Sequence, residues 1–114
     1  MATPTRLNLE DITSNIVQRK TTMQKLKGLM FTTPIQDEAH IFFHNKTKKH
    51  TYHMSFVFYP IDILFLKEDI VVDMKQDFLP FSTYTPKKPC DKAIELPRKT
   101  IRKHNVKRGD TITH

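Results

Sequence analysis

The stretch HTYHMSFVFYPIDILFLKEDIVVDM, residues 50–74, constrains the fold most strongly because it holds two apolar runs joined by a short charged segment. Residues 61–66 are nearly all apolar, which is typical of a strand buried on both faces. The charged residues 67–69 predict a turn into a second strand over residues 70–74. The sequence therefore predicts a hairpin built around a buried strand.

A proline and an aspartate stand within this apolar pattern. Pro60 has no amide hydrogen, so it should mark a strand entrance or a bulge. Asp62 has two interpretations: it accepts hydrogen bonds from nearby backbone amides and holds the strand in register, or it is a site carboxylate. We favour the structural interpretation, because isolated acids in strands usually serve structure and no second acid lies beside it.

Further strand patterns lie outward from this hairpin. They cover residues 12–20, 39–43, 50–58 and 93–96, and a terminal strand follows the turn at Gly109. The lysine-rich residues 44–50 are predicted to be a solvated turn, and the proline-containing residues 78–91 an extended connector.

Two short helices complete the pattern. One covers residues 22–27 with Thr21 as its cap, and the other covers residues 98–104 with Pro97 at its first position. The predicted fold is mostly β: a compact β-sandwich or a distorted, jelly-roll-like barrel with two short helices. Residues 1–11 form a lead-in that can be flexible, and residues 12–114 form a single domain.

The composition narrows the class of protein. The formal net charge of +7 favours anionic partners such as nucleic acid, phosphorylated ligands or acidic proteins. Cys90 is the sole cysteine, so neither an internal disulfide nor a cysteine-based zinc site can form. No apolar leader or run of roughly 18 apolar residues occurs, so we expect a cytoplasmic protein that does not enter the membrane.

The histidines and the cysteine give no clear catalytic or metal signature. His40 and His44 have even spacing, but the strand that carries them is predicted to end between them. His50 and His53 have odd spacing, which sends them to opposite faces of a strand. We therefore predict no metal ion or other cofactor. Cys90 would be reactive if exposed beside the neighbouring lysines, and inert if buried.

Basic residues crowd the end of the chain. They are Arg98, Lys99, Arg102, Lys103, Lys107 and Arg108. On a helix, Arg98 and Arg102 would share one face, and Lys99 and Lys103 the adjacent one. Such a surface could bind phosphates, with Tyr52, Tyr59 or Tyr84 stacking on bases, or it could simply be solvated.

Three separated motifs resemble the domain of unknown function 192 family, an uncharacterised family of bacteria and archaea. They consist of Gly28, Leu29, Met30 and Phe31; of Met54, Pro60, Asp62 and Phe65; and of Glu95, Leu96, Pro97, Gly109 and Asp110. The family usually has a glycine where this chain has Lys99. The resemblance implies a compact, mostly β sandwich or distorted barrel with short helices, and it implies no biochemical activity.

Three functions remain open on the sequence. The first is a non-catalytic domain that binds a small ligand or a protein through Met54, Tyr59, Pro60 and Asp62. The second is weak nucleic-acid binding through the basic segment. The third is a hydrolase that uses Asp62, Asp73 or the histidines, which would require two carboxylates or three metal ligands to converge.

Overall fold

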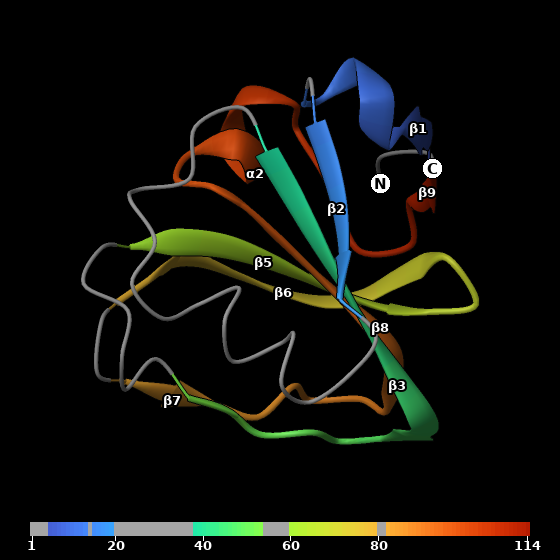
Figure 1. The fold of residues 1–114 in the computed structure, drawn as a ribbon, viewed down its shortest axis with the longest axis vertical. Coiled ribbons are helices and arrows are strands. Elements are labelled where there is room, and N and C mark those ends of the chain that lie inside the picture. Colours follow the sequence, from blue (N-terminus) through green and yellow to red (C-terminus); the bar gives the residue numbers. More distant parts are fainter. Residues whose placement is uncertain (1–4, 14, 20–37, 54–59, 80–81) are drawn as a thin grey trace.

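A seven-stranded sheet dominates the structure, a computed structural model that describes residues 5–13, 15–19, 38–53, 60–79 and 82–114 (Figure 1). Its order is β1-β9-β6-β5-β8-β3-β2, and β4 and β7 form a separate two-stranded sheet. The elements are β1 (Arg6–Asn8), the 3-10 helix η1 (Leu9–Asp11), β2 (Asn15–Arg19), β3 (Glu38–Lys48), β4 (Tyr52–His53), β5 (Ile61–Lys67), β6 (Ile70–Phe78), β7 (Thr83–Tyr84), β8 (Cys90–Pro97), α2 (Thr100–Lys103) and β9 (Thr111–Thr113).

The predicted central hairpin is confirmed. β5 begins directly after Pro60, turns at residues 68–69 and pairs antiparallel with β6. Its other edge pairs antiparallel with β8, so β5 lies in the middle of the sheet and all but its last residue are buried. A strand with neighbours on both edges and apolar groups on both faces explains why the sequence pattern is continuous rather than alternating.

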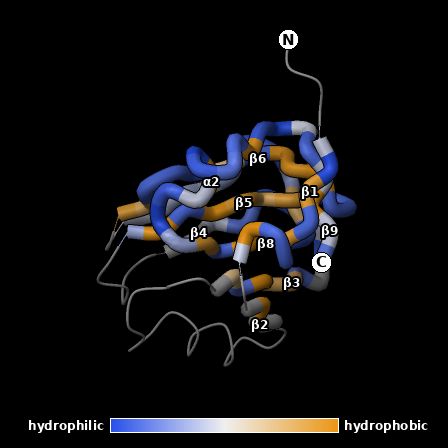
Figure 2. The backbone as a smooth tube through the Cα atoms, turned by 90° about the horizontal axis from the view of Figure 1, so that it is seen from above, coloured by the Kyte–Doolittle hydropathy of each residue, from blue (hydrophilic) through white to orange (hydrophobic). Residues whose placement is uncertain are grey.

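Two apolar clusters cover the two faces of this sheet. On the side we call the α2 face, Leu64 and Ile94 pack with Ile101 of α2. On the opposite side, which we call the β7 face, Phe65 and Ala93 pack in a cluster that Tyr84 of β7 flanks. Figure 2 shows hydrophobic residues along the central strands and hydrophilic ones around them. The sheet curls into a half-barrel, which confirms the mostly β prediction in its distorted-barrel form.

Three strand predictions need correction. Residues 44–50 are not only a turn, because β3 runs to Lys48, whose register partner is Cys90. A register shift after Phe43 accommodates this extension, and exposed lysine side chains are compatible with the solvated end of a strand. β6 likewise continues to Phe78, and the predicted connector contains β7, which pairs with β4.

The C-terminal helix is shorter than predicted and begins later. β8 continues through Pro97, which is the register partner of Ile61, so Pro97 cannot be the first helical residue. Lys99 precedes the helix with φ of 73°, and α2 covers only Thr100–Lys103. The other predicted helix, over residues 22–27, lies outside the described residues. Of the predicted strand over residues 50–58, residues 52–53 form β4, residues 50–51 are not in a strand, and residues 54–58 lie outside the described residues.

The described part of the lead-in is built into the sheet. β1 pairs in parallel with β9, and Leu9 of η1 is fully buried on the α2 face. The Cα radius of gyration is 12.9 Å, close to the roughly 13 Å expected for one domain of about 100 residues. None of the helices in the described ranges has the length and apolar character needed to cross a membrane.

Candidate functional site

A cleft of about 440 Å³ opens where the chain leaves η1 and where β8 meets α2. We call it the basic cleft. Its lining residues are Ile12, Thr13, Pro97, Arg98, Lys99, Thr100, Lys103 and His104. Three of the eight carry a fixed positive charge, and none is acidic.

The turn from β8 into α2 gives the cleft its shape. The Thr100 hydroxyl donates a hydrogen bond of 2.6 Å to the Pro97 carbonyl, which closes the turn around Arg98 and Lys99. Both of these side chains are exposed, whereas Thr100 is buried. The sequence signal of a proline before a basic helix therefore reflects a tight turn that presents two cations at its tip.

Asp62 stabilises this turn by accepting hydrogen bonds from backbone amides. It is fully buried, and one carboxylate oxygen accepts the Ile101 amide at 2.9 Å while the other accepts the Asp77 amide at 3.0 Å. Lys99 occupies the N-cap position but its side chain makes no capping bond, so Asp62 supplies the missing acceptor from another strand. These bonds are the backbone-amide contacts that the structural interpretation of Asp62 predicted, and Asp62 is not part of the cleft lining.

A second link connects the cleft to β6, which pairs with the strand that carries Asp62. Arg98 Nε donates to Asp77 Oδ1 at 2.7 Å, and it is the backbone amide of Asp77 that bonds Asp62. Asp77 has a left-handed backbone with φ of 50°, which aspartate tolerates better than most residues. Arg98 is thus partly neutralised and held in place, leaving Lys99 and Lys103 as the other fixed charges of the cleft.

The six predicted basic residues do not form one surface. Arg98, Lys99 and Lys103 meet in the cleft, while Arg102 is exposed but is not among the lining residues. Arg108 instead lies 3.4 Å from Asp73, and the Lys107 backbone amide donates to Asp110. The predicted two-face arrangement on a helix is wrong, because only residues 100–103 are helical.

Asp73 is the centre of a second polar cluster, on the β7 face. Its carboxylate accepts the Tyr84 hydroxyl at 2.6 Å, the Lys87 amide at 2.9 Å and the Met74 amide at 2.9 Å. Burial alone would raise the pKa of Asp73, but these hydrogen bonds and the charge of Arg108 together lower it below 3.8. Burial, followed by the hydrogen bond and the charge of Asp73, raises the pKa of Tyr84 to about 12.

This pair predicts loss of stability at both extremes of pH. The contribution of Asp73 is present above pH 3.8 and is lost as the pH falls through its lower folded-state pKa. The contribution of Tyr84 is complete below its ordinary pKa of 10.0 and is lost as the pH rises to about 12. In urea denaturation measured across pH, Tyr84→Phe should lower the free energy of unfolding by about 1–3 kcal/mol at pH 7. The variant should also show a smaller loss of stability at alkaline pH than the wild type. An unchanged alkaline decline would contradict this assignment.

Asp62 and Asp73 do not converge on a catalytic site. Asp62 and Leu64 are two residues apart on β5, so Asp62 lies on the α2 face with Leu64, where it accepts the Ile101 amide. Asp73 is the register partner of Phe65 and bonds Tyr84, so it lies on the β7 face. A register shift in the β5–β6 ladder between Phe65 and Leu66 accompanies this placement. The sheet therefore separates the two carboxylates.

Some of the remaining predicted site residues lie in the described part of the structure, and others lie outside it. Pro60 is half-buried at the entrance to β5, and Met54 and Tyr59 lie outside the described residues. His40 and His44 share β3, so the prediction that the strand ends between them is wrong. The His44 ring stacks on His50 with centroids 3.7 Å apart. Within the described ranges, no three His, Cys, Asp or Glu residues are grouped to hold a metal ion, and Cys90 is buried.

Sequence reasoning missed the N-terminal part of the cleft lining, Ile12 and Thr13. Ile12 and Thr13 precede β2 and are far in sequence from Thr100 and His104, which line the same cleft. No local pattern links these segments, because the sheet alone brings them together.

The sequence matches one known protein family. Residues 6–114 match the domain of unknown function 192 family (DUF192), described as "Uncharacterized ACR". No curated protein matches the sequence.

Two solved structures share the fold. The first is described as "a putative transcription regulator" from Sinorhizobium meliloti, with 21% identity, a TM-score of 0.75, and coverage of 82% of this chain and 76% of that one. The second is a protein of unknown function from Novosphingobium aromaticivorans, with 25% identity, a TM-score of 0.76, and coverage of 84% and 71%. Because the family match spans nearly the whole chain, the protein belongs to the DUF192 family.

Proposed function

We propose that the protein is a non-catalytic binding domain that holds a small anionic ligand in the basic cleft. The observation that carries this proposal is a cleft of about 440 Å³ that, among the described residues, is lined by Arg98, Lys99 and Lys103 and by no acid. Small-molecule sites typically measure about 300–1,000 Å³. The apolar atoms of Ile12 and Pro97 complete the wall, which is the usual combination of apolar surface with a few polar groups.

The contacts of the acids support binding rather than hydrolysis. Asp62 and Asp73 are buried, and each accepts hydrogen bonds from backbone amides. A general base must reach the proton it removes, and a carboxylate committed to backbone amides on one face cannot cooperate with one on the other. The surface from Met54 to Pro60 remains a proposed recognition site, and a cytoplasmic location remains a prediction.

Binding is tested by titrating the isotopically labelled protein with sodium pyrophosphate and following backbone amide shifts by NMR. We expect the largest shifts at Thr100, Lys103 and His104, which line the cleft. Lys103→Gln should weaken binding roughly tenfold or more, because a hydrogen bond to a charged group contributes about 1.5–3 kcal/mol.

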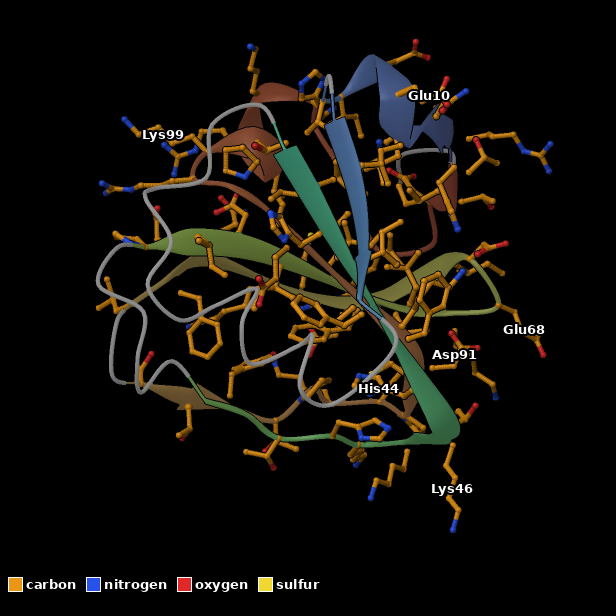
Figure 3. All side chains as sticks on the ribbon, in the orientation of Figure 1. Glu10, His44, Lys46, Glu68, Asp91 and Lys99 are labelled. Atoms are coloured by element: carbon orange, nitrogen blue, oxygen red, sulfur yellow. The ribbon has the colours of Figure 1, made fainter. Side chains whose placement is uncertain are left out.

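Lys46→Gln is the matched control for this variant. It removes the same charge from the exposed far end of β3, away from α2 (Figure 3). Its affinity should stay within twofold of the wild type. Equal losses in the two variants would show a diffuse effect of net charge and would overturn the cleft assignment.

Nucleic-acid binding is the second candidate, and the exposed position of Arg102 beside Lys103 favours it. Affinity for a 20-mer RNA or DNA would then fall steeply with salt, with a log-log slope of about 0.7–0.9 per phosphate contact. Replacing Arg102 and Lys103 together by Gln should flatten the slope by about two contacts. Arg102→Gln alone separates the candidates, because it should weaken nucleic-acid binding and leave pyrophosphate binding unchanged.

A further inference from the structure

Lys99 holds a backbone conformation that does not suit a lysine. Its φ is 73° and its ψ is 1°, in the left-handed region that only glycine enters without steric cost. Among the described residues, three of the four other non-glycine residues with positive φ are Asp69, Asp77 and Asn105, types that tolerate this region. Glu68, the fourth, lies in the tight β5–β6 turn. Lys99 therefore requires an explanation specific to its site.

The side chain of Lys99 does not compensate for this strain within the described part of the chain. It is exposed, it makes no capping hydrogen bond, and no ion pair with a described acid involves it. Figure 3 shows it at the margin of the molecule beside α2. A residue that is strained and makes no stabilising contact is typical of a site where function sets the residue type.

The donors in the cleft indicate which anion it suits. Lys99 and Lys103 are compact ammonium groups with three donors each, which bind phosphate oxygens as point charges. A planar carboxylate is best matched by the two-pronged guanidinium of arginine, but Arg98 already uses its Nε on Asp77. The free charges are thus better suited to a tetrahedral group carrying more than one negative charge.

We propose that the ligand of the basic cleft carries a phosphate group, and that Lys99 is the residue that selects it, retained at a position where glycine would be more stable. This inference rests on the proposed function and names its substrate class. It predicts that stability and binding respond in opposite directions to one substitution. Substitution of a lysine with only a structural role would not change stability and ligand binding in opposite directions.

The experiment compares Lys99→Gly, Lys99→Gln and the distant control Lys46→Gln by thermal melting and by calorimetric titration with pyrophosphate and succinate. Lys99→Gly should raise the melting temperature by on the order of 4 °C and weaken pyrophosphate binding at least tenfold. Lys99→Gln keeps the strained backbone, so it should lose affinity without gaining stability. Lys46→Gln should change neither property, and the wild type should bind succinate at least tenfold more weakly than pyrophosphate.

The contrary outcomes are distinct. A wild type that binds neither anion overturns the proposed function itself. Pyrophosphate binding that survives Lys99→Gly overturns only the role of Lys99. A lower melting temperature for Lys99→Gly overturns the strain argument, and equal affinity for succinate overturns the preference for phosphate.

Discussion

Replacing Asp62 by alanine is expected to lower the free energy of unfolding by about 2–6 kcal/mol. The carboxylate is the acceptor for the buried Ile101 amide and for the Asp77 amide, and each backbone donor left without a partner costs about 1–3 kcal/mol. Asp62→Asn should lower the free energy of unfolding about half as much, because the single carbonyl oxygen of asparagine can keep one of the two hydrogen bonds. Urea denaturation measures both values.

Asp91→Ala is the matched control for this loss. Asp91 is half-buried and also accepts a backbone amide, that of Glu68 at 3.1 Å, but this hydrogen bond is exposed to solvent. Its replacement should cost less than about 1 kcal/mol, because water can satisfy the amide. Hydrogen exchange should also show faster exchange of the Ile101 amide in Asp62→Ala. A variant that unfolds at the wild-type urea concentration would contradict the role of Asp62 as a clamp.

Replacing Phe65 by alanine is expected to cost about 3–5 kcal/mol, the range for deleting a buried aromatic ring from a core. Phe65 has no exposed surface, and its ring stacks on Tyr84 with centroids 5.5 Å apart. The loss should therefore also disturb the position of the Tyr84 hydroxyl on Asp73. Thermal and urea unfolding measure the stability, and the ultraviolet titration of tyrosine follows Tyr84.

Leu79→Ala provides the comparison for Phe65, because the Leu79 side chain is 58% exposed. Its replacement should change the free energy of unfolding by less than about 0.5 kcal/mol. If Phe65→Ala were as mild, the β7 face would not be a packed core, and the polar cluster on that face would need another support.

The central hairpin could be predicted because its signals are local. Pro60, the apolar run from Ile61 and the charged turn follow one another directly in the sequence. Such a local pattern is enough to predict a strand and the turn that follows it. The backbone acceptor role of Asp62 followed from the general requirement that a buried acid be satisfied. Its partners were not predictable, because Ile101 is 39 residues away in sequence.

The predictions that were wrong concern segments where contacts between distant parts of the chain decide the structure. Pro97 is a typical first residue of a helix, but pairing with Ile61 keeps it in β8, so tertiary contact overrides the local preference. The lysines after His44 resemble a turn, although a strand with a register shift also leaves them solvated. The basic cleft combines Thr13 with Thr100, two segments far apart in the sequence that only the folded chain brings to one cleft.

The parallel pairing of β1 with β9 has a consequence for how the protein folds. Arg6 is the register partner of Thr111, and the buried carboxylate of Asp110 accepts the Thr5 amide, 105 residues away. A nascent chain must therefore hold its first strand without a partner until translation has passed residue 113. Because β1 can join the sheet only after β9 has been synthesised, we expect completion of the sheet to be late and slow.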